Sequence, residues 1–264
     1  MRMQKTILVL LLFISFISFG QKEDFVSIKY VPQEINYSYQ LGDNTIILKC
    51  YQYGERKDIF MINLHSDETT SVEAAKQILQ ETGGVLLKIE NNNERIVSFN
   101  LNGKTFSFDP NRMFTKRGII ASLKKFRQYS SHVAKKIDGF AKFVLNKIHG
   151  KYKTLIALHN NDDGNYSIDT YANGDLSKAV TKVNVDNSQD KDNFFFTTDP
   201  HLHKNFVENN FNSALQNNRY VTDDGSLSVY YGKKKRSYVN VEAELGKKEE
   251  QMKMIWFLLG KTAN

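Results

Sequence analysis

The chain has 264 residues, 41% of them hydrophobic and only one of them cysteine, so its stability must come from a packed core and not from internal disulfide bonds. Its formal net charge of +7 could suggest nucleic acid binding, but the basic residues are scattered and the densest run is only Lys233 to Arg236. We interpret this run as a solvated hairpin turn between two strands, with attraction to anionic cell-envelope polymers as the alternative. The sequence therefore predicts no nucleic acid partner.

The first 20 residues have the pattern of a secretory signal peptide. Two basic residues precede an apolar run that ends at Phe19, and Gly20 completes a small-x-small cleavage site. The run is shorter than the roughly 20 residues that span a bilayer, so we expect cleavage and not stable membrane insertion. The sequence thus predicts a periplasmic or secreted protein, with residues 21–264 forming one α/β catalytic domain around a mixed, mostly parallel sheet flanked by helices.

The segment 58–68 is the first with a recognisable site pattern. An apolar strand leads to His65, a polar turn follows, and a helix is predicted from Ser71 to about residue 81, before two glycines. His65 and Glu68 are three residues apart across the turn, so both side chains can converge just beyond the carboxyl end of the strand. Ligands bind at this edge of open α/β sheets.

Two strands that flank Asn102-Gly103 are then expected to form a hairpin, and a polar turn follows. In this turn the guanidinium of Arg112 could hold a carboxylate with two hydrogen bonds, and Asn111 could add an amide donor. The alternative is a turn whose arginine is simply solvated. Apolar spacing over residues 116–148 predicts two helices.

The segment 153–161 repeats the arrangement of an apolar strand followed by a histidine, His159. If the two strands are parallel neighbours, both imidazoles lie at the same sheet edge. His65, Glu68 and His159 would then form a His2Glu set, which suits a catalytic zinc ion that keeps a fourth position for water. Taken singly, the His-x-x-Glu pattern could be chance and His159 an ordinary loop histidine.

The C-terminal half contributes loops and one further carboxylate. Residues 160–192 are rich in Asn and Asp and predict loops beside the site, and a helix that starts at Pro200 would carry His201 and His203 as surface residues. We expect strands at 226–232 and around residues 238–242.

The last of these strands would deliver Glu242, with Glu244 two residues further on. A carboxylate beside a zinc-bound water is a suitable general base for hydrolysis. Either glutamate could instead be an exposed charge at the end of a strand. A helix over residues 247–259 is expected to close the domain.

The order of these motifs resembles the zinc carboxypeptidase family typified by carboxypeptidase A. The run that follows Glu68 is closer to the succinylglutamate desuccinylase and aspartoacylase branch of that family. The resemblance extends from about residue 59 to residue 259, but it consists of four short motifs. Ser66-Asp67 after the first histidine and Pro110 before the Asn-Arg pair depart from the family pattern, which leaves the substrate pocket undefined.

The resemblance implies roles for individual residues. His65, Glu68 and His159 would bind zinc, and Glu242 or Glu244 would be the general base. The other implied roles are oxyanion stabilisation by Arg95, binding of the substrate carboxylate by Asn111 and Arg112, and substrate contact by Tyr230 or Tyr231.

The function expected from these features is zinc-dependent hydrolysis of an amide bond next to a free carboxylate. The substrate would be a small peptide, for which cell-wall-derived peptides are one source. The alternatives are an N-acyl amino acid amidohydrolase and a non-catalytic binding protein on the same fold.

Overall fold

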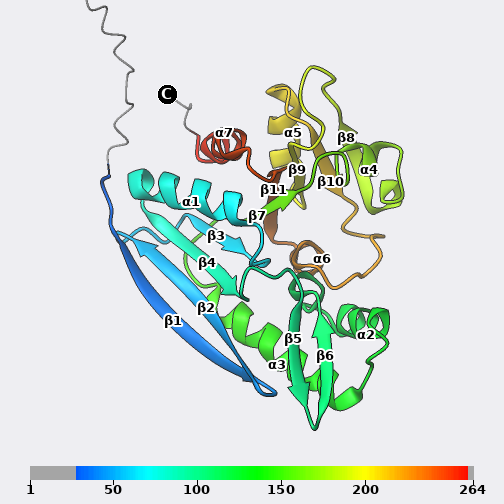
Figure 1. Ribbon diagram of the computed structural model, residues 1–264. Helices are drawn as coiled ribbons and strands as arrows, with labels where there is room; N and C mark the ends of the chain where they lie inside the picture. The colour runs from blue at the N-terminus through cyan, green and yellow to red at the C-terminus, as the bar shows by residue number, and fades with distance from the viewer. Residues whose placement is uncertain (1–27, 261–264) are drawn as a thin grey trace, which may run out of the picture.

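The computed structural model describes residues 28–260, so the predicted signal peptide lies outside the described residues. Residues 28–260 form a single α/β domain in which nine strands make one mixed sheet, with helices on both faces (Figure 1). The fold class predicted from the sequence is therefore confirmed. Among the described helices, none is both long and apolar enough to cross a membrane.

The sheet combines a parallel centre with edges whose pairings are antiparallel, except for the parallel pair of β9 and β10. Its strands follow the order β1-β2-β4-β3-β7-β11-β9-β10-β8, and β5 and β6 form a separate hairpin. The strands are β1 (Pro32–Leu41), β2 (Asn44–Tyr53), β3 (Phe60–Asn63), β4 (Gly84–Glu90), β5 (Val97–Leu101), β6 (Lys104–Phe108), β7 (Thr154–Asn161), β8 (Val180–Asn184), β9 (Phe194–Thr197), β10 (Ser213–Gln216) and β11 (Ser237–Glu244).

The parallel centre of the sheet consists of β4, β3, β7 and β11. Both faces of β3 and β7 are covered, which explains why these two strands appear in the sequence as short apolar runs without alternation. The register of β7 and β11 pairs His159 with Glu242. Because paired residues of neighbouring strands point to the same side of a sheet, these two side chains share one face.

Helices cover both faces of the sheet. On one face α1, α5 and α7 bury apolar side chains against β3, β7, β9 and β11, and on the other α2, α3 and α6 pack with the β5–β6 hairpin (Figure 1). The helices are α1 (Thr69–Thr82), α2 (Lys116–Lys125), α3 (Ser131–Lys147), α4 (Asp169–Ala172), α5 (Pro200–Glu208), α6 (Leu227–Lys233) and α7 (Lys248–Leu258), with short 3-10 turns η1 (Pro110–Arg112) and η2 (Ser177–Ala179).

Three sequence predictions of secondary structure are wrong. Residues 226–232 were expected to be a strand, but residues 227–233 form α6, whose first turn is capped where the Ser226 hydroxyl accepts from the Val229 amide. The basic run 233–236 therefore joins a helix to β11 and is not a hairpin turn between two strands. Apolar side chains at alternate positions imitated a strand because this short helix is buried on several sides. The polar stretch 160–192 contains α4, η2 and β8 as well as loops.

The prediction that His203 is a surface residue is also wrong. Its side chain is only 5% exposed, because it faces the backbone of Ser213 in β10. His201, in the same helical turn, is exposed as expected.

Candidate metal centre

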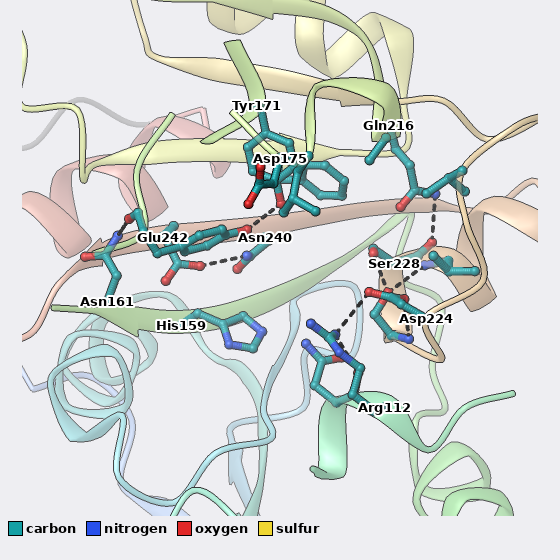
Figure 2. A pocket seen from close by; sticks show the side chains of 18 of the residues that line it. Arg112, His159, Asn161, Tyr171, Asp175, Gln216, Asp224, Ser228, Asn240 and Glu242 are labelled. Carbon is teal, nitrogen blue, oxygen red and sulfur yellow. Dashed lines mark hydrogen bonds and ion pairs between the residues drawn. The ribbon is translucent and has the colours of Figure 1, made fainter. Parts of the chain in front are cut away.

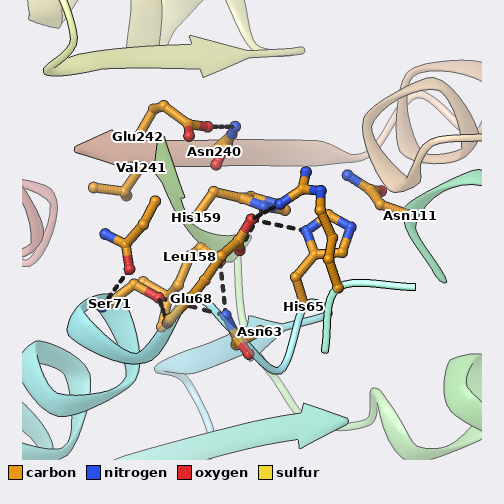
Figure 3. A network of polar contacts seen from close by, with 12 residues as sticks. Asn63, His65, Glu68, Ser71, Asn111, Leu158, His159, Asn240, Val241 and Glu242 are labelled. Atoms are coloured by element: carbon orange, nitrogen blue, oxygen red, sulfur yellow. Dashed lines mark hydrogen bonds and ion pairs between the residues drawn. The ribbon is translucent and has the colours of Figure 1, made fainter. Parts of the chain in front are cut away.

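Three side chains from separate parts of the chain converge at the carboxyl end of the parallel strands. His65 follows β3, Glu68 is the residue before α1, and His159 lies in β7 (Figure 3). One potential ligand atom from each lies within 4.8 Å of the others, and the three residues are 1%, 3% and 4% exposed. The structure thus brings together the His2Glu set expected from the sequence, although β7 continues two residues beyond His159.

Hydrogen bonds hold the turn between β3 and α1 in place. The amide of Glu68 donates to the carbonyl of His65 at 3.3 Å, and the Ser71 hydroxyl donates to the carbonyl of Glu68 at 2.9 Å. The Asn63 amide group donates to the carbonyl of Leu158, which ties this turn to β7. The two histidines are therefore positioned by strands that pair directly.

The donor atoms of the three residues suit a metal ion. The Nδ1 atom of His65 lies 2.8 Å from Glu68 Oε1, and the Nδ1 atom of His159 lies 3.0 Å from Glu68 Oε2. The second contact lacks hydrogen-bond geometry, so Glu68 Oε2 is buried without a hydrogen-bond partner. Buried polar atoms without partners are rare, and an unseen ion is one of their common explanations. Two imidazoles and one carboxylate are also the ligand set of catalytic zinc sites.

Asp109, which the sequence analysis did not single out, orients His65. Its Oδ1 atom lies 2.8 Å from His65 Nε2, so it can accept the proton of that nitrogen and leave Nδ1 for a metal. Burial opposes protonation of His65, but the carboxylates of Glu68 and Asp109 outweigh it and raise its pKa to about 9. Burial favours the neutral forms of Glu68 and Asp109, but the neighbouring histidines outweigh it. They hold the pKa of both carboxyl groups well below the usual range. The sequence signal was an aspartate that directly precedes the Asn-Arg turn.

Glu242 lies across the site from these ligands. It is 3% exposed, and the Asn240 amide donates to its Oε2 atom at 2.9 Å (Figure 3). Burial raises the pKa of Glu242 to about 7, against the opposing effect of His159. Glu244, the alternative placement, lies 3.8 Å from the ammonium of Lys247 and does not line the cleft.

A cleft of about 890 Å³ opens beside the centre, and three of the predicted basic and amide groups line it. Arg95 Nη1 lies 2.6 Å from Glu68 Oε1, so its guanidinium reaches the carboxylate of the centre. Arg112 is 41% exposed and lies 3.3 Å from Asp224 (Figure 2). The Asn111 side-chain oxygen accepts from the amide of Leu227.

Tyr230 is not among the described residues that line the cleft. Its ring contacts those of Phe114 and Tyr231 in the core, so the structure does not bring it to the centre. Tyr231 is buried, with its hydroxyl on that of Tyr152. Tyr171 and the exposed Tyr220 line the cleft instead, in stretches that have no sequence pattern to distinguish them from other loop tyrosines.

Comparisons with known proteins show only distant likenesses. No family model and no curated protein matches the chain. Among solved structures, an aspartoacylase family protein from Mesorhizobium loti is 11% identical with a TM-score of 0.44, and covers 88% of this chain and 68% of its own. A putative succinylglutamate desuccinylase/aspartoacylase from Shewanella frigidimarina is 11% identical with a TM-score of 0.37, and the match covers 88% of this chain and 72% of that protein.

A zinc-bound cold-adapted esterase from an Arctic intertidal metagenomic library is 14% identical with a TM-score of 0.22, over 56% of this chain and 64% of its own. The first two bear the names of the branch that the sequence motifs resemble. Likenesses at this level carry no argument about activity, so the function has to be argued from the site itself.

Proposed function

We propose that this protein is an exported zinc-dependent hydrolase that cleaves an amide bond next to a free carboxylate. The observation that carries the proposal is the buried convergence of His65, Glu68 and His159, with Glu242 facing the same space. Two imidazoles and one carboxylate would hold a zinc ion and would leave room for a water molecule beside it. His65 and His159 would bind through Nδ1, because these are the nitrogens that face Glu68.

The contacts of Glu242 and Arg95 suggest a role for each in hydrolysis. When bound, zinc supplies a Lewis acid that polarises the scissile carbonyl and lowers the pKa of a water molecule toward ~7. Glu242, which is buried and shares a sheet face with His159, takes a proton from the attacking water and passes it to the leaving amine. Arg95 offers guanidinium hydrogens to the carbonyl oxygen as it becomes negative.

Asn111 and Arg112 would orient the substrate. The guanidinium of Arg112 opens onto the cleft and can hold the substrate carboxylate, and its ion pair with Asp224 would be exchanged for that contact. The side-chain oxygen of Asn111 is already bonded to Leu227, so its amide hydrogens are left for the ligand. Fixing the carboxylate determines which amide bond lies next to Glu242.

The proposal is tested by metal content and turnover together. The mature protein should copurify with about one zinc ion per chain, and His65→Ala and His159→Ala should lose it. His203→Ala is the matched control, because His203 is equally buried but lies outside the centre. If His65→Ala and His159→Ala retain as much zinc as His203→Ala, the proposal is contradicted.

A panel of dipeptides and N-acyl amino acids separates the two hydrolase alternatives, since the carboxylate site serves both. A binding protein on the same fold would hold zinc without turning over any member of the panel. Export is tested separately, by the N-terminal residue of protein recovered from the periplasm or the medium, which should be near Gln21.

A further inference from the structure

The positive charge of the chain is concentrated in one segment. Residues 116–153 contain eleven lysine and arginine residues and a single acidic residue, Asp138, whereas the rest of the chain contains 25 basic and 28 acidic residues. No run within the segment exceeds two basic residues, so the imbalance is visible only over its whole length. The net positive charge of the protein therefore comes from this segment, which forms α2 and α3 and leads into β7.

These charges lie on the surface and have few partners within the fold. Nine of the eleven basic side chains are exposed, and the other two are half-buried. Among the ion pairs of residues 28–260, only the contact of Lys142 with Asp138, at 2.6 Å, involves this segment. Ion pairing inside the protein therefore does not explain why so many cations are placed here.

The connection between α2 and α3 brings several of these cations together. It is only five residues long, and it packs on the neighbouring hairpin, where the Ser107 amide of β6 donates to Gln128 Oε1 at 2.7 Å. α2 lies beside β6 at the lower right of Figure 1. The name basic tip is used here for the residues at this connection: Lys124, Lys125, Arg127, Tyr129 and Lys135.

The stability of the two helices explains only part of this charge. Lys124 and Lys125 lie in the last turn of α2, where cations stabilise the end of a helix. Arg127 and Lys135 have no such position. At the start of α3, moreover, Ser130 makes no side-chain capping bond and the first turn contains no acidic residue. An anion from outside the protein would therefore be attracted both by the cations and by the free end of α3.

An exposed aromatic ring lies among these cations. Tyr129 is 48% exposed, and the ammonium of Lys124 is 5.9 Å from the centre of its ring. Tyrosine is enriched where a membrane meets water, because its ring is apolar and its hydroxyl polar. Clustered lysines and arginines beside such a ring are attracted to anionic lipid headgroups.

The shape of the basic tip also favours a flat partner. None of its residues lines the cleft, and none lines the smaller cavity at Asp43 and Ser98. A single nucleic acid strand is usually held in a basic groove with several stacking platforms, whereas the tip offers one ring at the end of a helix pair. A bilayer surface needs no groove.

We propose that the basic tip attaches this protein to the surface of a bilayer that contains anionic phospholipids. The contact is peripheral and reversible, with the ring of Tyr129 among the headgroups and the cations facing lipid phosphates. No residue of 116–153 lines the cleft, so attachment leaves the candidate metal centre open to substrate. The proposal goes beyond the proposed function and requires neither zinc nor hydrolysis.

The test is co-sedimentation of the mature protein, residues 21–264, with lipid vesicles. One set of vesicles contains phosphatidylcholine alone, and the other contains equal parts of phosphatidylcholine and phosphatidylglycerol. The protein should bind the anionic vesicles at least tenfold more tightly at about 0.1 M salt, and about 1 M salt should release it, because the screening length then falls to about 3 Å. Equal binding to both sets, or no binding to either, would overturn the proposal.

A pair of matched double variants locates the contact. Lys125→Gln with Arg127→Gln should weaken binding to the anionic vesicles at least tenfold. The control, Lys234→Gln with Lys235→Gln, removes the same charge. Both pairs are exposed at the end of a helix, and each includes a residue with positive φ, 57° at Arg127 and 54° at Lys235. An equal loss of binding in both would mean that net charge alone is responsible and would overturn the proposal.

A third variant separates a membrane surface from a general site for polyanions. Tyr129→Ser keeps every charge and should weaken binding to the anionic vesicles at least threefold, because it removes the ring that enters the headgroup layer. A short DNA duplex should not displace the protein from the vesicles. Unchanged vesicle binding by Tyr129→Ser, or displacement by the duplex, would identify a polyanion site and contradict attachment to a membrane.

Discussion

Replacing Glu242 by glutamine should abolish activity and at the same time stabilise the metal-free protein above pH 7. Glutamine has the shape of the protonated acid and can still accept the hydrogen bond from Asn240. It cannot accept a proton from water, so we expect kcat to fall by roughly 10²–10⁴-fold. The gain in stability follows from the burial of the carboxylate.

The size and sign of that gain follow from the pKa of Glu242. Burial raises it from 4.5 to about 7, so between these values the unfolded chain has lost a proton that the folded chain retains. The free energy of unfolding therefore falls as pH rises through this window and levels off above it. The difference between these two pKa values corresponds to about 3 kcal/mol in the free energy of unfolding. The wild type loses this amount above pH 7, and the glutamine variant does not.

Urea unfolding of chelator-treated wild type and variant at pH 4.5 and pH 8 measures this effect. The variant should match the wild type at pH 4.5 and exceed it by about 2–3 kcal/mol at pH 8. Glu244→Gln is the control, because Glu244 is partly exposed beside Lys247 and should change neither stability nor activity much. A variant that is no more stable than the wild type at pH 8 would refute the burial argument, and loss of activity only in Glu244→Gln would transfer the role of base to that residue.

Three further outcomes are expected at the centre. Asp109→Asn should weaken zinc binding about 10- to 100-fold in a competition titration with a chromogenic chelator, since Asp109 orients His65; unchanged affinity would mean that it does not. Arg112→Lys should raise KM at least tenfold with a smaller change in kcat, because a point charge cannot form both hydrogen bonds to a carboxylate; an effect on kcat alone would contradict this role. Zinc at 100 times its Kd should stabilise the wild type against urea by about 2.7 kcal/mol but leave His159→Ala unaffected, and an equal response in both would place the metal elsewhere.

Much of the candidate metal centre was predictable because its signals are local. His65 and Glu68 share one turn, and His159 ends a second run of the same type, so hydrophobic patterning alone indicated which side chains lie at the sheet edge. Pairing of the two strands then had to be assumed, and the structure supplies it. The two helices over 116–148 and the hairpin at Asn102-Gly103 were predictable for the same reason.

The shape of the cleft was not predictable, since it depends on contacts that leave no local pattern. Gln216 lies in a four-residue strand between two loops, and its orientation is set by Asn218 and by the backbone of Ser228. No local sequence pattern distinguishes Tyr230 from Tyr220. Tyr230 nevertheless packs against Phe114, whereas Tyr220 is exposed at the cleft. Tertiary contacts alone distinguish such residues.

The pairing of β7 with β11 has a consequence for how the centre forms during folding. His159 and Glu242 are paired only once β7 and β11 have aligned. These strands are far apart in the sequence, and β9 and β10 lie between them along the chain. Strand pairings of such long range are slow to form, because the entropy of closing the intervening chain opposes them. On the proposed function, a partly synthesised or clipped chain that lacks β11 would contain all three proposed metal ligands but not Glu242, the proposed base, so hydrolysis would require the last strand of the sheet.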